Sequence, residues 1–292
     1  MSGSLGRMLT DYHMHTQPDG VGARADGAER WDAHGGPWSA GWLAAYVAAA
    51  AARGVDEIAM TEHVYRFREA ADWHDDVFWR EEATASLDEY VGGVAAARDE
   101  GLPVLLGIEM DWLPHRTDEI RALLDRTPFD VVLGSVHWIG ATPVDNPNDP
   151  PRLDAHDLWE AYLDAVIAAA ESGLFDVLAH VDLAKIFGLR APDSVAGRVD
   201  ELVERVAAAG VAIECSTAGL RKPVGELYPD PDLLARFQAA GVPVTLSSDA
   251  HRPEDVGRDY PTAVAALRGA GYSTITRFAE RAPEQVEFAP WM

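Results

Sequence analysis

The sequence predicts an α/β fold built from repeated strand–helix units, and three patterns lead to this prediction. Seven short apolar runs rich in Val, Ile, Leu or Met recur along the 292 residues. Alanine-rich amphipathic stretches separate the runs, and several end in glycine just where the next run begins, as in ARGVDEI and AAGVPVT. Such runs are typical of buried parallel strands, and glycine is common at a helix C-terminus. The repeats therefore favour a barrel or a doubly wound sheet.

The apolar runs define the expected strands, and the stretches between them define the expected helices. The strands are expected at residues 8–15, 57–63, 104–112, 131–138, 177–183, 211–217 and 244–251. The helices are expected at residues 38–53, 84–100, 117–126, 155–173, 195–209, 230–241 and 254–270. No linker rich in Pro, Gly or Ser divides the chain, so we expect a single domain over residues 1–292.

Long connections follow three of the predicted strands, at residues 16–37, 64–83 and 139–154. Active-site loops occupy this position in such folds, because they follow the carboxyl ends of the strands. The connection 64–83 is rich in aromatic residues, which predicts either a lid over a substrate or a satellite hydrophobic cluster under a long loop. These residues are Tyr65, Phe67, Trp73, Phe78 and Trp79.

Composition and charge exclude several classes of protein. The chain has 24 Lys and Arg residues against 48 Asp and Glu residues, a formal net charge of −24. A surface this acidic repels phosphate backbones, so we expect no nucleic-acid partner. The only cysteine, Cys215, argues against a disulfide-bonded secreted scaffold and favours a cytoplasmic protein. No apolar run is long enough to span a bilayer, so no membrane partner is expected.

Six of the ten histidines lie at the ends of predicted strands, more than random placement would give. They are His13, His15, His63, His137, His180 and His251. A single histidine at a strand end is most often a hydrogen-bonded structural residue. Six that converge on one barrel mouth are most simply explained as metal ligands. The default expectation for the other four is the surface: His34, His74, His115 and His156.

Carboxylates accompany these histidines. His13 and His15 are two residues apart in one strand, so their side chains point to the same face. Asp249 and His251 repeat this spacing on the last strand. Glu109 ends an apolar run, where an unpaired carboxylate would be costly, and a carboxylate can bridge two cations, which a histidine cannot.

Six short motifs occur in order along the chain: DYHMHT, TEH, GIE, GSVH, AHVDL and SSDAH. Together they resemble the polymerase and histidinol phosphatase (PHP) superfamily over nearly the whole chain. The stretch STAGLRKPVGELYP is similar to the histidinol-phosphatase branch of that family in particular. The resemblance implies a distorted (β/α)7, TIM-like barrel and a trinuclear metal centre.

The resemblance also implies a set of metal ligands. The first ion would be held by His13, His15, Glu109 and Asp249, and the second by Glu109, as a bridge, with His137 and His180. The third would be held by His63, His251 and one ligand from the loop after the first strand, for which we choose Asp19, with His34 as the alternative. Ligands without thiolate suit zinc, manganese or iron. Two to three such ions would supply a bridging hydroxide, held by Glu109 and Asp249, near neutral pH.

Three basic side chains are candidates for binding a phosphate group. Arg221 and Lys222 follow the sixth strand, where the family contacts phosphate, and Lys185 follows His180. A guanidinium can bind phosphate through two parallel hydrogen bonds. The resemblance, through the family's phosphate contact in this loop, favours Arg221 over Lys222. A solvated loop residue is the alternative for each lysine. We expect Asp182 to orient His180 from behind.

The predicted activity is metal-dependent hydrolysis of a small phosphate monoester. The resemblance implies that the substrate is L-histidinol phosphate, that the products are L-histidinol and phosphate, and that the reaction belongs to histidine biosynthesis. Two alternatives stay open: a PHP phosphoesterase that acts on another small phosphate or a nucleotide, and a non-catalytic metal-binding scaffold. A complete ligand set argues against the scaffold. The oligomeric state is not predicted.

Overall fold

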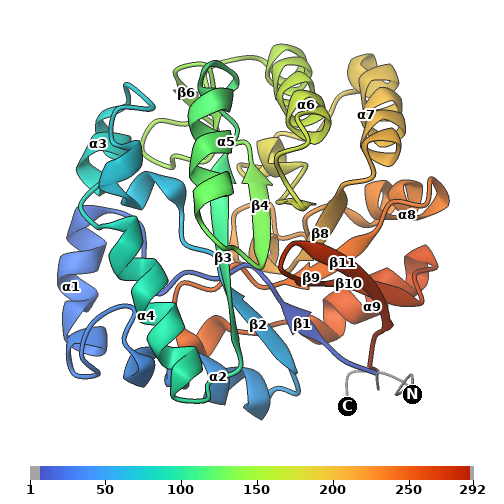
Figure 1. The fold of residues 1–292 in the computed structure, drawn as a ribbon. Coiled ribbons are helices and arrows are strands. Elements are labelled where there is room, and N and C mark those ends of the chain that lie inside the picture. The colour runs from blue at the N-terminus through green and yellow to red at the C-terminus, as the bar shows by residue number, and fades with distance from the viewer. Residues whose placement is uncertain (1–6, 290–292) are drawn as a thin grey trace.

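Seven parallel strands form the centre of the molecule in a computed structural model that describes residues 7–289 (Figure 1). Their order in the sheet follows their order in the chain: β1 (Thr10–Asp11), β2 (Glu57–Met60), β3 (Val104–Asp111), β4 (Val131–Ser135), β7 (Val177–Leu178), β8 (Ala212–Ser216) and β9 (Val244–Ser247). Beyond the last strand, Ala250 accepts a hydrogen bond of 2.7 Å from the backbone of His15, so the two edges of the sheet meet. The predicted seven-stranded TIM-like barrel is confirmed.

Helices follow the strands and cover the outside of the barrel (Figure 1). They are α2 (Ala40–Ala52), α4 (Leu87–Asp99), α5 (Thr117–Arg126), α6 (Ala155–Glu171), α7 (Ala196–Ala209), α8 (Pro231–Ala239) and α9 (Tyr260–Ala270). Each lies within a predicted helical stretch. Helix α9 begins later than the expected residue 254, because Gly257 and Asp259 adopt φ angles of 63° and 61° that no helix contains.

The three long connections contain short elements that the sequence did not predict. The first contains helix α1 (Val21–Asp32), of which only Trp31 is buried, so it has almost no apolar stripe to reveal it. The second contains the 3-10 helices η1 (Val64–Arg66) and η2 (Arg68–Ala70) and helix α3 (Val77–Glu82). The third begins with a small hairpin of β5 (Trp138–Ile139) and β6 (Thr142–Pro143).

A C-terminal hairpin of β10 (Thr274–Ala279) and β11 (Ala282–Glu287) closes the end of the barrel opposite the carboxyl ends of the strands. Arg281 bonds Asp176, just before β7, and Arg277 bonds Glu57, the first residue of β2, both at amino ends of barrel strands. Phe278 enters the apolar cluster inside the barrel. The hairpin therefore closes the barrel at the amino ends of the strands, and the mouth at their carboxyl ends is available for a site.

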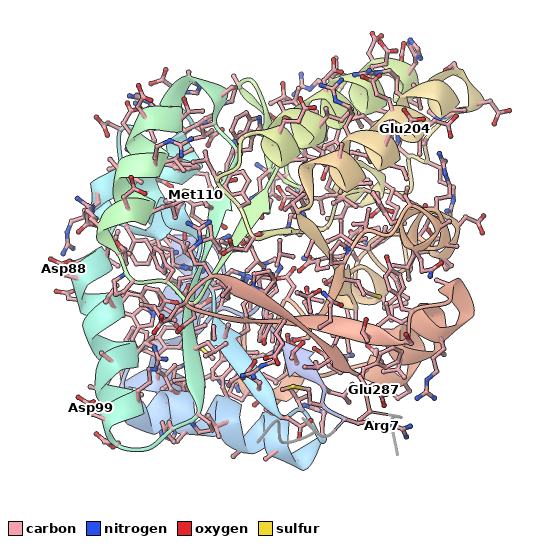
Figure 2. The ribbon with its side chains drawn as sticks, turned by 45° about the vertical axis from the view of Figure 1, so that its right-hand side comes forward. Arg7, Asp88, Asp99, Met110, Glu204 and Glu287 are labelled. Atoms are coloured by element: carbon pink, nitrogen blue, oxygen red, sulfur yellow. The ribbon has the colours of Figure 1, made fainter. Side chains whose placement is uncertain are left out.

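Acidic side chains cover the outer faces of the helices. Figure 2 shows Asp88 and Asp99 on α4 and Glu204 on α7 pointing outward, whereas Met110 of β3 is buried. The excess of negative charge thus lies largely on the exterior. Among residues 7–289, no helix combines the length and the apolar character that crossing a bilayer requires.

Candidate metal centre

A buried carboxylate, Glu109, lies at the centre of the barrel mouth near the end of β3. Its side chain is fully shielded from solvent, and five imidazoles surround it. Oε2 lies 3.2 Å from Nε2 of His13, 3.4 Å from Nε2 of His15 and 2.5 Å from Nδ1 of His63. Oε1 lies 3.1 Å from Nε2 of His180 and 3.4 Å from Nε2 of His137. The five imidazoles come from the segments that follow four strands, β1, β2, β4 and β7, so the barrel itself assembles this cluster.

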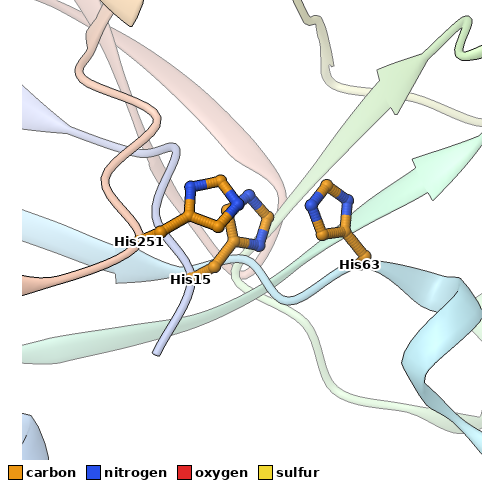
Figure 3. Close-up of side chains that lie close together, drawn as sticks. All are labelled: His15, His63 and His251. Atoms are coloured by element: carbon orange, nitrogen blue, oxygen red, sulfur yellow. The ribbon is translucent and has the colours of Figure 1, made fainter. Parts of the chain in front are cut away.

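Two further carboxylates, Asp249 and Asp19, contact the histidines on the solvent side. Oδ1 of Asp249 lies 3.5 Å from Nε2 of His15 and 3.6 Å from Nδ1 of His251. Oδ2 of Asp19 lies 3.2 Å from Nε2 of His251 and 3.5 Å from Nε2 of His63. Figure 3 shows His15, His63 and His251 side by side, and the rings of His15 and His63 are stacked with centroids 3.9 Å apart.

All nine side chains chosen as metal ligands thus meet at one mouth. We call Glu109, His13, His137 and His180 the inner cluster, and Asp19, His15, His63 and His251 the outer cluster; Asp249 lies between them. His34, the alternative to Asp19, is exposed and its ring packs near Trp42, with centroids 5.4 Å apart. The geometry favours Asp19.

Two residues of the site adopt backbone conformations that are rare for side chains with a Cβ atom. His180 has a φ of 29° and Asp249 a φ of 50°, and both follow the ends of barrel strands. Such conformations cost roughly 1–3 kcal/mol each and persist where the surroundings impose them. In His180, buried hydrogen bonds impose the unusual backbone conformation: its N–H donates to Glu214, and its carbonyl accepts from Tyr162. The chain is strained where it turns these side chains toward the cluster.

Three buried acids behind the histidines were not singled out from the sequence. Glu214 on β8 lies 2.9 Å from Nδ1 of His13, and Asp111 lies 2.8 Å from Nδ1 of His137. Glu62 lies 3.8 Å from Nδ1 of His15. In His13 and His137, the acceptor at hydrogen-bond distance from Nδ1 fixes the ring and leaves Nε2 as the ligand atom. The sequence signal that could have revealed Glu214 is the presence of an acid in the middle of the apolar run VAIECST.

Many polar atoms of this cluster are buried without a hydrogen-bond partner in the described part of the chain. They include Nε2 of His13, both ring nitrogens of His15 and of His63, and Oε2 of Glu109. Buried polar atoms without partners are costly, and here nitrogens and carboxylate oxygens face one another at close range. Imidazole and carboxylate donors with no thiolate suit divalent transition metals. The residues present therefore fit bound divalent cations.

The charges of the cluster lead to the same conclusion. Burial alone would raise the pKa of Glu109, but His13, His63 and His137 hold the pKa of this carboxyl well below its usual range. Burial likewise opposes ionisation of Asp249, and the neighbouring histidines again hold its pKa low. Both carboxylates stay ionised and require positive charge beside them, which divalent cations supply more strongly than protonated imidazoles.

The structure gives Asp182 and Lys185 contacts other than the predicted ones. The 3-10 helix η4 (Leu183–Lys185) folds Lys185 back, and its Nζ lies 2.6 Å from Asp182 and 2.7 Å from the Leu227 carbonyl. A buried ammonium needs such partners, so Lys185 pairs internally instead of reaching a phosphate. The bonded oxygen of Asp182 also accepts from the backbone of Asp230, and no contact joins Asp182 to the His180 ring within the described residues.

Arg221 and Lys222 line an open pocket of about 1220 Å³ that is continuous with Asp19, Asp249 and His251. Arg221 ends the 3-10 helix η6 (Ala218–Arg221) after β8. Its guanidinium donates to the carbonyl of Ser248 at 2.5 Å and to that of Thr217 at 3.3 Å. These bonds hold it beside the end of β9 that carries Asp249. The opposite wall comes from α1, through residues such as Asp26 and Trp31.

The aromatic residues of connection 64–83 form a packed cluster instead of a lid. Tyr65 stacks on His63 with centroids 4.4 Å apart, and Trp79 and Phe78 pack around Trp138. Phe67, Trp73 and Trp79 are buried, and none of the aromatic residues of this connection borders the described pocket. The satellite-cluster interpretation is the one that the packing supports.

A TIM-like barrel that gathers histidines and carboxylates at the carboxyl ends of its strands has the architecture of a metal-dependent hydrolase. Comparison with known proteins specifies the family: the chain belongs to the PHP family, since residues 38–218 match the model of the PHP domain. A relative from Deinococcus radiodurans, named "Probable histidinol-phosphatase", is 36% identical over 274 residues, covering 92% of this chain and 96% of the relative.

More distant relatives carry the same kind of name. The "Histidinol-phosphatase" of Bacillus subtilis is 24% identical over 245 residues, covering 75% of this chain and 90% of the relative. A crystal structure of histidinol phosphate phosphatase from Lactococcus lactis, complexed with zinc, L-histidinol and phosphate, aligns with a TM-score of 0.72 at 20% identity. It covers 96% of this chain and 100% of that chain, and at this identity it supports the fold.

Proposed function

We propose that this chain is a phosphoric monoester hydrolase that converts L-histidinol phosphate into L-histidinol and phosphate in histidine biosynthesis. One observation carries the proposal: the buried carboxylate of Glu109 with five imidazoles around it, at a barrel mouth that opens into a pocket lined by Arg221. The relative at 36% identity supports this substrate.

The proposed site binds two to three divalent ions. His13, His15, Glu109 and Asp249 would hold one, Glu109, His137 and His180 a second, and Asp19, His63 and His251 a third. When bound, such ions lower the pKa of a coordinated water and neutralise phosphate oxygens. Zinc, manganese and iron all suit these ligands, and zinc is present in the Lactococcus lactis complex.

The chain's own residues bind and orient the phosphate group. Arg221 is held by two backbone carbonyls, so its guanidinium is fixed in direction before a substrate arrives. In the proposed complex its N–H groups that point into the pocket donate to phosphate oxygens, and Lys222 adds a second positive charge. Aspartates also line this pocket, so the positive charge that a phosphate needs would come from these two cations together with the bound divalent ions.

The experiment compares substrates and removes the metal. Purified protein should hydrolyse histidinol phosphate with a kcat/KM several orders of magnitude above that for p-nitrophenyl phosphate, because the amino alcohol is recognised as well as the phosphate. Chelation should abolish turnover, and added zinc or manganese should restore it. Equal activity on both esters would point to an unspecific phosphoesterase, and no activity on any phosphate to a metal-binding scaffold.

Three expectations stay predictions. A single domain over residues 1–292 is compatible with one barrel, and limited proteolysis that leaves the chain intact would support it. The cytoplasmic location is still inferred from the single cysteine. The partner is proposed to be the small phosphorylated substrate alone.

A further inference from the structure

Arg66 is the most buried arginine near the site, and the metal-centre proposal gives it no role. It ends the 3-10 helix η1, three residues after His63, and only 1% of its surface is exposed. A buried guanidinium must have partners for its charge and for its donors. The partners of Arg66 are carboxylates that lie against the outer cluster.

Three carboxylates surround this guanidinium. Nε lies 3.0 Å from Glu62, Nη1 lies 3.3 Å from Glu82 and Nη2 lies 2.8 Å from Oδ1 of Asp19. Nη2 also donates to the carbonyl of Gln17 at 3.0 Å. Arg24 of α1 provides a second cation, which pairs with Glu82 and not with Asp19. Glu62 and Glu82 are buried, whereas the Asp19 side chain is 36% exposed.

The two oxygens of Asp19 have different partners. Oδ1 bonds Arg66, whereas Oδ2 faces Nε2 of His63 and Nε2 of His251. A carboxylate whose rear oxygen is held cannot rotate, so its front oxygen stays directed at the two histidines. Glu62 differs from Asp19, because its Oε2 both bonds Arg66 and approaches His15, while its Oε1 accepts from Thr16.

The loop that carries Asp19 depends on this contact. Asp19 precedes Gly20, whose φ of 89° marks a turn into α1, a mostly polar helix. Among residues 7–289, Arg66 is the side chain that bonds both Gln17 and Asp19, and the remaining side-chain contacts of Asp19 are with the two histidines of the outer cluster. Without the guanidinium, the carboxylate would keep only its contacts with these two histidines.

We propose that Arg66 is the positioning residue for the third cation: it fixes Asp19 as a ligand of the outer cluster and thereby sets the affinity of that site for a divalent metal. The inference rests on the proposed metal centre. It assigns to Arg66 no contact with the substrate and no part in the bond that breaks. It predicts that loss of the guanidinium weakens one metal site and leaves the inner cluster occupied.

The test measures metal binding to the full chain. Apo protein is titrated with zinc alone by equilibrium dialysis and elemental analysis, for wild type, Arg66→Lys, Arg66→Met and Asp19→Asn. A lysine keeps the charge but cannot reach three carboxylates as the guanidinium fork does. The weakest site should lose about 10- to 100-fold in affinity in Arg66→Lys and in Asp19→Asn. Excess zinc should restore activity in Arg66→Lys.

Two controls separate positioning from general destabilisation. Arg24→Met removes a cation from the same network without touching Asp19, so its zinc isotherm should match wild type. The double variant Asp19→Asn/Arg66→Lys should bind zinc no more weakly than Asp19→Asn alone, because both changes break one link. The Arg66→Met result is used only if the near-ultraviolet circular dichroism spectrum of this variant matches that of wild type. If Arg66→Met does not fold, Asp19→Asn still tests the same link.

The outcomes distinguish this inference from the proposal on which it rests. Three zinc equivalents in wild type and one weakened site in Arg66→Lys are expected. Three equivalents of unchanged affinity in Arg66→Lys overturn the role of Arg66 and leave the metal centre standing. Only two equivalents in wild type overturn the three-ion centre, and this inference with it.

Discussion

The inner and outer clusters of the candidate metal centre are built differently. In the inner cluster, Glu109 lies on β3 and His13 follows β1, and both side chains are almost completely buried, with exposed fractions of 0% and 1%. In the outer cluster, Asp19 comes from a loop and is 36% exposed, and His251 is 25% exposed. Strands fix a side chain through the sheet itself, whereas a loop needs a separate contact. Changes in the inner cluster should therefore be severe, and changes around the outer cluster graded.

The largest effect is expected at Glu109. Glu109→Gln keeps the shape of the side chain but removes the charge that faces five imidazoles, so turnover should fall by orders of magnitude. Metal content should fall by about one equivalent or more. Steady-state kinetics and elemental analysis of the same preparation check both. Asp19→Asn is the matched comparison, and an equal loss in both variants would show that the clusters do not differ.

A smaller effect is expected at Arg221. Arg221→Ala should lower kcat/KM for histidinol phosphate roughly 10- to 100-fold, since a charge-assisted hydrogen bond contributes about 1.5–3 kcal/mol. Metal content should not change, because Arg221 contacts backbone carbonyls and the pocket. Arg221→Lys should recover only part of the loss.

Arg190→Ala is the control for Arg221, because Arg190 is exposed and pairs with Glu226 away from the pocket. Exposed pairs of this kind contribute little, so its kinetics should match wild type. If Arg221→Ala lost metal together with activity, Arg221 would belong to the support of the outer cluster and not to the binding of phosphate.

Glu214 tests whether the inner cluster also depends on support from behind. Glu214→Gln weakens the contact to Nδ1 of His13 and the one to the backbone of His180. Zinc affinity of an inner site should fall about 10- to 100-fold, as is typical when the partner of a metal-binding histidine is changed. A zinc titration measures it, with Glu226→Gln as the control at a half-buried position. Unchanged affinity would mean that the strands alone hold His13.

The smallest effect on activity is expected from Cys215, which lies on β8 beside Glu214. Burial raises the pKa of its thiol from 9.0 to about 12, so the thiolate fraction at pH 8 is about a thousand-fold below that of an exposed cysteine. Reaction with a thiol reagent should be very slow in folded protein and fast in denaturant, and Cys215→Ser should stay active. Rapid labelling of native protein would show that the packing between β8 and the helices around it opens readily.

The inner cluster was predictable from the sequence to a greater extent than its surroundings. Ligands such as His13 and Glu109 stand at the ends of apolar runs, and in a parallel barrel all such ends meet at one mouth. The strand order and most helices followed from the same periodicity. Helix α1 was missed because it buries little more than Trp31, and Glu214 was missed because one acid inside an apolar run has no periodic signal.

The unexpected contacts of Asp182 and Lys185 have a related cause. Sequence position alone placed both near His180, and the 3-10 helix η4 then folded Lys185 onto Asp182. Two charged residues three apart satisfy each other when burial leaves them no water. The same rule explains Arg66, which lies three residues after His63 and bonds the acids around it. Pairings of this kind depend on local turns, which strand and helix periodicity does not report.

The C-terminal hairpin has a consequence for how the protein is made. It delivers Phe278 to the barrel interior and pairs Phe288 with Met8, so residues from the two ends of the described chain complete the same structure. A ribosome synthesises the first strand long before its neighbour β9 or the hairpin, and contacts between distant residues form slowly. Until residues 274–288 have been synthesised, the barrel floor stays open and its apolar lining exposed. During translation the nascent chain therefore exposes apolar surface that the finished hairpin covers.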